Sequence, residues 1–210
     1  MSISTVPQIT SPPDNLITIE QAAAWCKSSF EPDDPLIGMA RTFAMGLANK
    51  FCQRELRLRN HTEYVSIVPE SIPAIRVKNA PIISSPGLTA AESVELWMTG
   101  LPELVEVQWL PKTQYTVDAN TGIVRSYSGF IPGYRTIKVV YAAGYDMDTV
   151  PSELQLGILQ TTAWIVSQRA NDGMSSEKMT DWGATYLKRV SGLPEDIASL
   201  LSRFRRHSVA

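Results

Sequence analysis

The stretch Ile137-Lys-Val-Val-Tyr-Ala-Ala-Gly-Tyr145, followed by Val150-Pro151 and an apolar run from Leu154 to Trp164, decides the fold of this chain. Its first part is rich in β-branched residues, which favour an extended strand. Gly144 permits a sharp reversal after the strand, and Pro151 suits the first position of a helix. The stretch therefore predicts a strand over 135–142, a tight turn, and a well-buried helix from Pro151 to Asn171-Asp172-Gly173.

Upstream of this stretch, the N-terminal part of the chain predicts two helices. Thr18 and Gln21 have the spacing of a capping box, and apolar residues recur after them at helical intervals as far as Cys26. A second helix should begin at Pro35 and run to about Arg54. We expect its apolar face to consist of Leu36, Met39, Ala40, Phe43, Leu47 and Phe51.

Between the helical segments, apolar and polar residues alternate with a period of two, as half-exposed strands require. Asp118-Ala-Asn-Thr-Gly122 predicts a hairpin loop, with glycine available for a positive φ angle. Pro194 opens a last helix, whereas 175–190 has no clear pattern. The predicted strands are 64–68, 74–78, 93–98, 105–110, 115–117, 123–125 and 135–142.

These elements predict an α+β fold: a helical bundle core of two N-terminal and two or three C-terminal helices, with a β-rich insertion between them. Residues 1–15 carry prolines, serines and threonines and little to bury, so we expect a flexible N-terminal arm there. Residues 16–210 are expected to form a single domain, with helices in 16–55, the insertion in 56–147 and helices in 148–206.

The composition is that of an ordinary globular protein. The chain has 210 residues, is 44% hydrophobic and has a formal net charge of -2, which gives no argument for binding nucleic acid or an anionic membrane. No signal peptide or membrane-spanning run is expected. The two cysteines, Cys26 and Cys52, are interpreted as buried thiols in a reducing compartment.

The sequence offers few residues for catalysis. Neither of the two histidines, His61 and His207, has a cysteine or another histidine at the sequence spacing of a metal site. His61 is interpreted as a surface residue. Neither a nucleophile elbow nor a phosphate-binding loop is found. The acidic pairs Asp33-Asp34 and Asp146-Asp148 are interpreted as favourable charges near helix starts. We therefore predict no catalytic, metal-binding or cofactor-binding residues, and no enzymatic activity.

Two segments are candidates for contact with other proteins. The C-terminal residues Arg203, Phe204, Arg205, Arg206 and His207 form the one local basic cluster. They are interpreted as a docking tail for an acidic partner, as cations that complement the end of the last helix, or as a DNA contact. The proline-rich stretch 72–87, which is uncharged from Asn79 onward, is hard to explain as core, so a neighbouring subunit is expected to cover it. The predicted inter-subunit contact residues are Ile72, Ile75, Ile82, Ile83 and Leu88.

Four ordered segments of the sequence resemble the head-tail connector (adaptor) proteins of long-tailed phages. Leu16–Trp25 resembles the opening helix of that family, and Asp33–Ile37 with the run to Phe51-Cys52 resembles its second helix. Tyr115–Ile123 resembles its hairpin, and Ile137–Trp164 its strand, turn and long helix. Together these matches cover about half of the chain. Two features depart from the family: 56–110 is an enlargement, and the opening helix carries alanines where basic residues are common.

The resemblance implies a structural protein of the virion, assembled in the host cytoplasm and placed in the neck between capsid vertex and tail. It implies a dodecameric ring that docks on the portal protein, extends the DNA channel and provides the attachment site for a stopper or tail-completion protein. Double-stranded DNA would pass through without sequence-specific binding. It also implies that the basic C-terminal cluster reaches the portal. Two alternatives stay open: another neck or tail-completion protein, or a ligand-binding or enzymatic α+β domain.

Overall fold

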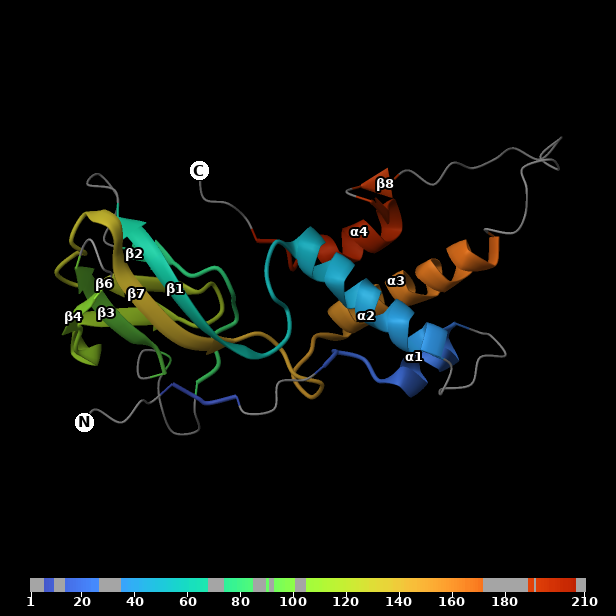
Figure 1. Cartoon of the computed structure of the whole chain (residues 1–210), viewed down its shortest axis with the longest axis horizontal. Coiled ribbons are helices and arrows are strands. Elements are labelled where there is room, and N and C mark those ends of the chain that lie inside the picture. Colours follow the sequence, from blue (N-terminus) through green and yellow to red (C-terminus); the bar gives the residue numbers. More distant parts are fainter. Residues whose placement is uncertain are drawn as a thin grey trace. The chain divides into compact units, whose positions relative to one another are not determined.

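The computed structural model describes residues 6–9, 14–26, 35–67, 74–84, 90, 93–100, 105–171, 189–190 and 192–206 (Figure 1). Its helices are α1 (Ile19–Trp25), α2 (Pro35–Cys52), α3 (Ser152–Asn171) and α4 (Glu195–Ser202), with a short 3₁₀ helix η1 (Lys112–Gln114). Its strands are β1 (Arg59–Ile67), β2 (Ala74–Arg76), β3 (Glu95–Gly100), β4 (Val105–Trp109), β5 (Tyr115–Asp118), β6 (Ile123–Ser126), β7 (Gly133–Ala143), β8 (Arg189–Val190) and β9 (Leu193–Pro194).

The chain divides into two compact units. One consists of 1–12 and 56–145 and contains β1 to β7; we call it the β unit. The other consists of 13–55 and 146–210 and contains the helices α1 to α4 together with β8 and β9; we call it the helical unit. The predicted α+β class is confirmed, with two helices before the strand-rich part and two described helices after it.

The β unit contains two antiparallel sheets. The larger has the strand order β1-β7-β3-β4, and the smaller has the order β2-β6-β5. Side chains from both sheets meet in one core, because alternate residues of each strand point to the same side. The buried residues of this core are Ile67, Ile75, Val77, Ile82, Val94, Leu96, Leu110, Tyr115, Val124, Ile137, Val139, Tyr141 and Ala143.

The predicted strand at 135–142 is confirmed as β7, which is the central strand that pairs with both β1 and β3. The predicted strand at 64–68 was too short, because β1 begins at Arg59 and its first five residues pair with 139–143 of β7. These residues are mostly polar, so their extended conformation follows from pairing with β7 rather than from a local apolar pattern.

The turn after β7 depends on Gly144. Its φ angle is +115°, and a Cβ atom there would lie 2.3 Å from the carbonyl oxygen of Arg57. The backbone of Tyr145 is hydrogen-bonded on both sides: its N–H donates to Leu56 O at 2.8 Å, and Leu58 N–H donates to Tyr145 O at 2.7 Å. Only glycine allows both this φ angle and this close approach of the two backbone segments.

The helical unit is built around α3, which packs against α1, α2 and α4. The contacts depend on small residues, because Ala40, Ala44 and Ala48 of α2 are buried at intervals of four. On α3, a Cβ atom at Gly157 would lie 2.8 Å from Leu201 Cδ2, so this glycine lets α4 approach closely. Thr161 and Thr162 are fully buried and donate their hydroxyl hydrogens to backbone carbonyls one turn earlier.

The ends of α1 and α2 follow local sequence signals. The predicted capping box is confirmed: Gln21 N–H donates to Thr18 Oγ1 at 3.1 Å, and Thr18 N–H donates to Gln21 Oε1 at 2.8 Å. Helix α2 ends at Cys52 because Gln53 adopts a positive φ of 57°. Gln53 N–H and Arg54 N–H then donate to the carbonyls of Lys50 and Asn49, which is a Schellman ending.

Part of the predicted N-terminal arm has a described position in the β unit. Val6 is 3% exposed, Asn60 donates its amide hydrogen to Pro7 O at 2.6 Å, and Ile9 N–H donates to Asn60 Oδ1 at 2.7 Å. Asn15 is also buried, in the helical unit. Residues 1–5 and 10–13 of the predicted arm lie outside the described residues. The single-domain organisation of 16–210 stays a prediction.

Candidate functional site

The described side chains that could take part in chemistry are few. No group of three or more His, Cys, Asp or Glu side chains that could hold a metal is found among the described residues. Both cysteines are free thiols, and Cys52 is fully buried. Burial raises the pKa of the Cys26 thiol and raises that of Cys52 to about 11, so both thiols stay protonated near neutral pH.

One polar cluster in the β unit brings together Glu63 and His61 of β1, Tyr141 of β7 and Asn79. The Tyr141 hydroxyl donates to Glu63 Oε1 in a short hydrogen bond, and Asn79 N–H donates to the Tyr141 hydroxyl oxygen at 3.2 Å. Lys78 N–H donates to both Glu63 carboxylate oxygens, at 3.1 and 2.9 Å. Burial and the adjacent Glu63 carboxylate raise the pKa of the Tyr141 hydroxyl.

The interpretation of His61 as a surface residue is wrong, because its ring is half-buried within this cluster. His61 Nδ1 lies 3.2 Å from Asn79 Nδ2, and the His61 ring lies 5.4 Å from the Tyr141 ring, centroid to centroid. The contacts join the segment at 78–79 to β1 and β7. The cluster therefore orders this segment of the β unit, since its oxygens and backbone amides are used in bonds within the unit.

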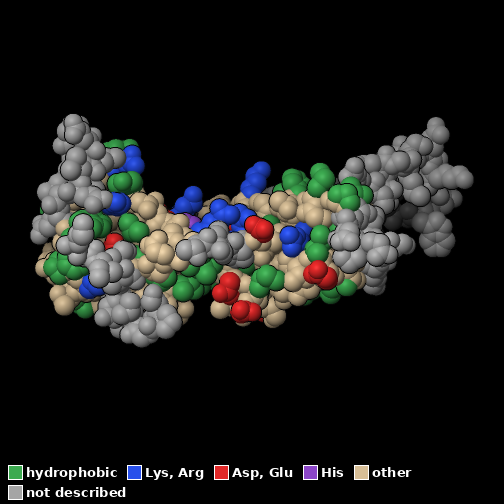
Figure 2. All heavy atoms as spheres, turned by 60° about the horizontal axis from the view of Figure 1, so that its bottom comes forward, with side chains coloured by type: hydrophobic (Ala, Val, Ile, Leu, Met, Phe, Trp, Pro, Cys, Tyr) green, Lys and Arg blue, Asp and Glu red, His purple; other side chains and the backbone are tan. Residues whose placement is uncertain are grey.

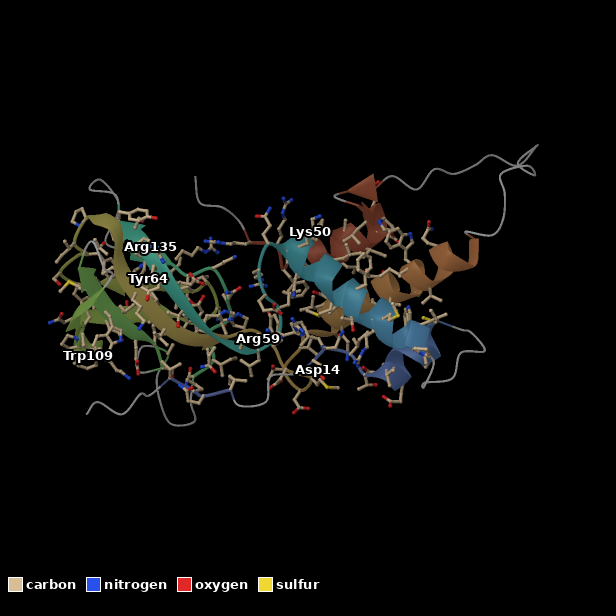
Figure 3. The ribbon with its side chains drawn as sticks, viewed as in Figure 1. Asp14, Lys50, Arg59, Tyr64, Trp109 and Arg135 are labelled. Atoms are coloured by element: carbon tan, nitrogen blue, oxygen red, sulfur yellow. The ribbon has the colours of Figure 1, made fainter. Side chains whose placement is uncertain are left out.

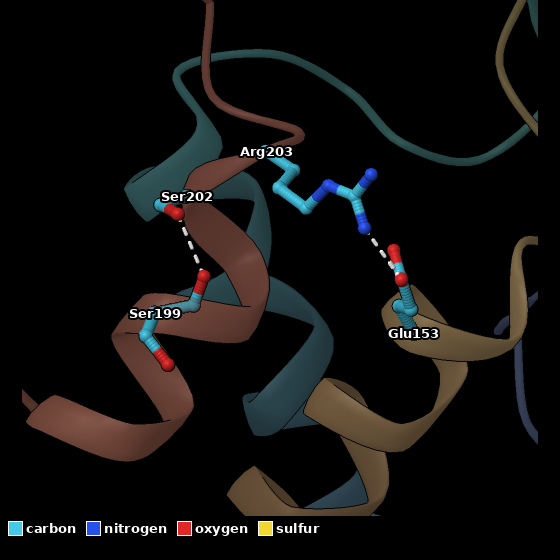
Figure 4. A network of polar contacts seen from close by, with 4 residues as sticks. All are labelled: Glu153, Ser199, Ser202 and Arg203. Atoms are coloured by element: carbon cyan, nitrogen blue, oxygen red, sulfur yellow. Dashed lines mark hydrogen bonds and ion pairs between the residues drawn. The ribbon is translucent and has the colours of Figure 1, made fainter.

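The predicted docking residues begin where α4 ends. Arg203 lies at the C-cap of α4, and its Nη1 atom lies 2.5 Å from Glu153 Oε1 of α3 (Figure 4). Both side chains are largely exposed, so this pair contributes little to stability. In the same view Ser202 donates its hydroxyl hydrogen to Ser199 O at 2.6 Å. Arg203 is thus held by α3 while its charge stays at the surface.

Phe204 does not lie at the surface with its basic neighbours. It is 9% exposed, and Arg206 N–H donates to Cys52 O at 2.9 Å, so the segment packs against the end of α2. The Arg205 guanidinium is exposed and lies 5.7 Å from the centre of the Phe51 ring. Phe204 is therefore a packing residue of the helical unit, and the prediction that it docks on a partner has no exposed surface to support it. His207 lies outside the described residues.

The predicted inter-subunit residues separate into three groups. Ile75 and Ile82 are 5% and 3% exposed, so the core of the β unit already covers them and no neighbouring subunit is needed. Ile83 is half-buried, and its N–H donates to Ala142 O at 2.9 Å. Ile72 and Leu88 lie outside the described residues.

Large hydrophobic side chains are exposed on both units, and sequence reasoning did not find them. Figure 2 shows apolar side chains at the surface among charged ones. The predicted apolar face of α2 was wrong for Met39 and Phe43, because the buried face consists of Ile37, Ala40, Ala44, Met45 and Ala48. The exposed residues of this kind are Trp25, Met39, Phe43, Tyr64, Tyr127, Ile131, Tyr134 and Met147.

The β unit carries its exposed aromatic residues on β1, on the segment between β6 and β7 and at the start of β7. Tyr127, Ile131 and Tyr134 are 70%, 57% and 65% exposed, and 126–134 contains no charged residue. At Tyr64, the guanidinium of Arg135 lies 4.6 Å from the ring centroid, and Figure 3 labels both residues. Exposed tyrosine and arginine side chains are enriched at protein contact surfaces.

The helical unit carries a pocket of about 480 Å³ between α1, α3 and the start of α4. Two tryptophans contribute to it: Trp25 is 43% exposed, and Trp164 is half-buried rather than a full core residue. Gln160 Oε1 is buried there with no hydrogen-bond partner among the described residues. The lining residues are Ala24, Trp25, Gln160, Trp164, Pro194, Asp196 and Ile197.

No family model and no curated protein matches this sequence. A solved chain from the neck of an empty gene transfer agent particle, computed with C6 symmetry, matches with a TM-score of 0.59 at 13% identity, over 97% of this chain and 96% of that chain. A chain from the neck of the native particle, computed with C12 symmetry, gives a TM-score of 0.57 at 12% identity, over 98% and 97%. A chain from the virion of the native particle gives 0.58 at 12% identity, over 97% and 96%.

At these identities the likeness shows a shared fold over nearly the whole length of each chain. In the described part of the chain, no helix combines the length and the apolarity that a membrane crossing requires.

Proposed function

We propose that this chain is a structural protein of the neck of a tailed phage or phage-like particle, and that it works as a head-to-tail adaptor. Copies of the chain form a closed ring, with twelve as the expected number, between the capsid vertex and the tail. The ring docks on the portal protein, continues the DNA channel and presents a surface to the stopper or tail-completion protein. DNA passes through without sequence-specific contact, and the chain performs no catalysis.

The observation that carries the proposal is the match in fold along 97% of this chain to a neck chain from a symmetric particle. A match that includes both units is more informative than one limited to a single unit, because the order helices, strands, helices must also agree. Sequence resemblance supports the same class independently, since it rests on the four ordered segments 16–25, 33–52, 115–123 and 137–164.

The surface of the chain also supports an assembly role. Phe43 on the helical unit and Tyr127 and Tyr134 on the β unit are 59%, 70% and 65% exposed. Large aromatic side chains are costly to leave in water, and they provide most of the binding energy where proteins meet. A subunit that contacts a ring neighbour, a portal and a tail protein requires several such surfaces.

The docking segment is proposed in a revised form. Arg203, Arg205 and Arg206, together with His207, supply charge toward an acidic portal surface, while Phe204 holds the segment against the helical unit. Truncation after Leu201 is then a poor test of docking, because it also removes the Phe204 packing and the hydrogen bond from Arg206 to Cys52. A charge reversal at exposed Arg205 leaves both in place.

The experiment mixes the purified chain with the portal protein of the same particle and images the product by negative-stain electron microscopy. We expect rings stacked on portals with the native chain. Arg205→Glu should weaken docking by roughly tenfold, because it opposes an acidic surface. Arg125→Glu, at an exposed arginine of the β unit, is the matched control and should dock as the native chain does.

The adaptor role is contradicted if the native chain does not associate with the portal at any concentration at which the portal is intact. If it binds a tail-tube or completion protein instead, it belongs to another level of the neck. If Arg205→Glu docks as well as the native chain, the basic segment has no docking role, and the proposal of a ring-forming adaptor still stands.

A further inference from the structure

One face of α2 is apolar and exposed. The helix buries Ile37, Ala44 and Ala48 against the rest of the helical unit, so residues half a turn away point outward. Met39 and Phe43 lie there one turn apart and are 66% and 59% exposed. We call Met39, Phe43 and Lys50, all on this outward side, the α2 stripe. Figure 3 shows Lys50 at the C-terminal end of the helix.

The pocket of the helical unit is a separate surface, because none of its lining residues belongs to α2. Its walls are apolar where Trp25, Trp164 and Ile197 contribute. A volume of about 480 Å³ lies within the roughly 300–1,000 Å³ of typical binding pockets, which is room for large apolar side chains. The unpartnered Gln160 Oε1 also indicates that the pocket lacks a polar contact, since a buried acceptor without a donor is costly.

The charges of the two surfaces are opposite. Helix α2 contains Arg41 and Lys50 and no acidic residue along its whole length. The pocket has Asp196 in its rim, and Glu195 is the neighbouring residue in the first turn of α4. The stripe is apolar with a lysine at one end, and the pocket is apolar with an aspartate at its rim. The two surfaces therefore match in apolar character and in charge.

We propose that the α2 stripe of one copy inserts into the pocket of the next copy, with Phe43 against Trp25 and Trp164. The inference rests on the proposed function, and it names the surfaces by which the helical units of neighbouring copies meet. Because stripe and pocket are different surfaces of one chain, the contact is heterologous. Repeating it leads to a closed ring if the rotation between copies divides a full turn, as a neck requires.

The experiment uses two variants of the full chain that each lose one surface. Phe43→Ser removes the main side chain of the stripe and keeps the pocket. Ala24→Arg fills the pocket with a charged side chain and keeps the stripe, and Ala24 is exposed, so the core is undisturbed. Met147→Ser, which removes an exposed apolar side chain of the helical unit outside both surfaces, is the matched control. Self-association is measured by sedimentation velocity and mass photometry, alone and with portal.

We expect each of the two variants alone to lose rings, with self-association at least roughly tenfold weaker, while Met147→Ser behaves as the native chain. The decisive sample is the equal mixture of Phe43→Ser and Ala24→Arg. One intact stripe then meets one intact pocket, and the pair has no surfaces left for growth, so dimers should form and nothing larger.

Rings that persist in both variants would overturn this inference and leave the proposed function standing. Loss of rings without dimers in the mixture would also overturn it, because the two surfaces would then meet other partners rather than each other. A native chain that stays monomeric both alone and with portal would contradict the proposed function as well. Thermal unfolding of each variant, unchanged from the native chain, establishes that a loss of rings comes from the surface.

Discussion

The helical unit and the β unit fill their interiors with different residues. In the helical unit, six of the described buried residues are alanines: Ala22, Ala23, Ala40, Ala44, Ala48 and Ala198. Phe51 and Phe204 are buried beside them, but three other large residues of the unit, Trp25, Met39 and Phe43, are exposed. In the β unit, the core consists mainly of isoleucine, valine, leucine and two tyrosines, and polar groups such as Glu63 and Asn79 are bonded within it.

The comparison shows two roles for a large apolar side chain, which are contact with other chains and packing of the unit's own core. Small residues let helices approach closely, so the helical unit does not need to bury all of its large side chains, and Trp25, Met39 and Phe43 are free to contact other chains. The β unit uses large side chains to hold two sheets together, and it exposes aromatic residues on β1, between β6 and β7 and at the start of β7. Substitutions should therefore affect folding most inside the β unit and assembly most on the outside of the helical unit.

Gly144→Ala tests the tightest position of the β unit and should have the largest effect. The new Cβ would meet the backbone of Arg57 at 2.3 Å, and alanine rarely adopts a φ of +115°. We expect a loss of about 3–5 kcal/mol in the free energy of unfolding, measured in urea. Gly46→Ala, on the exposed side of α2 with no atom near its Cβ, should instead stabilise by about 1 kcal/mol. Equal effects at both glycines would contradict the comparison.

Leu154→Ala and Trp164→Ala compare the inside and the edge of the helical unit. Leu154 is fully buried, so its truncation should cost about 3 kcal/mol. Trp164 is larger but only half-buried beside the pocket, so we expect about 2 kcal/mol rather than the larger loss of a fully buried tryptophan. Urea unfolding followed by circular dichroism measures both. A greater loss at Trp164 would mean that its ring belongs to the core.

Alkaline pH should weaken both units. Burial raises the Cys52 pKa from 9.0 to about 11, so between these values the unfolded chain releases its thiol proton first. The contribution of the protonated Cys52 thiol to the free energy of unfolding is fully present below pH 9. It falls as pH rises, by up to about 2.5 kcal/mol near pH 11. Burial also raises the pKa of Tyr115 and Tyr141, so the β unit loses stability in the same direction at higher pH.

The Cys52 contribution is isolated by comparing the native chain with Cys52→Ala across this pH range. The difference in free energy of unfolding between the two should be constant below pH 9 and should shrink above it. A constant difference up to pH 11 would mean that the thiol ionises as easily in the folded chain as in the unfolded one.

Tyr141→Phe tests the polar cluster of the β unit. The substitution removes the donor to Glu63 and the acceptor for Asn79 N–H, and leaves both groups without that bond. We expect a loss of about 2 kcal/mol in thermal or urea unfolding. Tyr134→Phe, where the hydroxyl is on a 65% exposed side chain, should change nothing measurable. An equal effect of the two would mean that the cluster is not a source of stability.

Thr18→Ala should have the smallest effect. It removes one half of the capping box and should cost about 1 kcal/mol, seen as a small shift in the thermal midpoint of the helical unit. Thr42→Ala is the control, since the Thr42 hydroxyl bonds only to Gly38 O within the same exposed helix face. No shift at Thr18 would indicate that tertiary contacts alone fix the start of α1.

Local signals were sufficient for much of the fold. The strand at 135–142, the turn at Gly144, the capping box at Thr18 and the hairpin at 118–122 were predictable, because each is determined by residues a few positions apart. The start of α4 followed from Pro194 for the same reason.

What the sequence could not supply depends on contacts between distant residues. The buried face of α2 was misassigned because Met39 and Phe43 are more hydrophobic than Ala40, Ala44 and Ala48, yet the alanines allow close packing against α3. Alanines repeated every fourth residue were the signal that could have identified the correct face. The N-terminal half of β1 has a polar sequence and is extended only because β7 pairs with it.

The candidate surfaces were predicted less well. Arg203 and Arg205 are exposed as expected, but Phe204 packs against a segment that is far away in sequence. Ile75 and Ile82 were assigned to a neighbour because they lie in a proline-rich stretch that is uncharged from Asn79 onward, whereas the core of the same unit covers them. The pocket combines residues from α1, α3 and α4, so no local pattern could reveal it.

The split make-up of the helical unit also determines when it can fold during synthesis. The segment from Leu56 to Tyr145 leaves the ribosome as one uninterrupted piece of the β unit, whereas the bond from Arg206 N–H to Cys52 O at the end of α2 can form only after Arg206 has been made. At ~5–20 residues per second, the interval of about 150 residues lasts roughly 8–30 s. During that time α2 lacks its contacts with α4, so part of its apolar surface stays open to water and to other nascent chains.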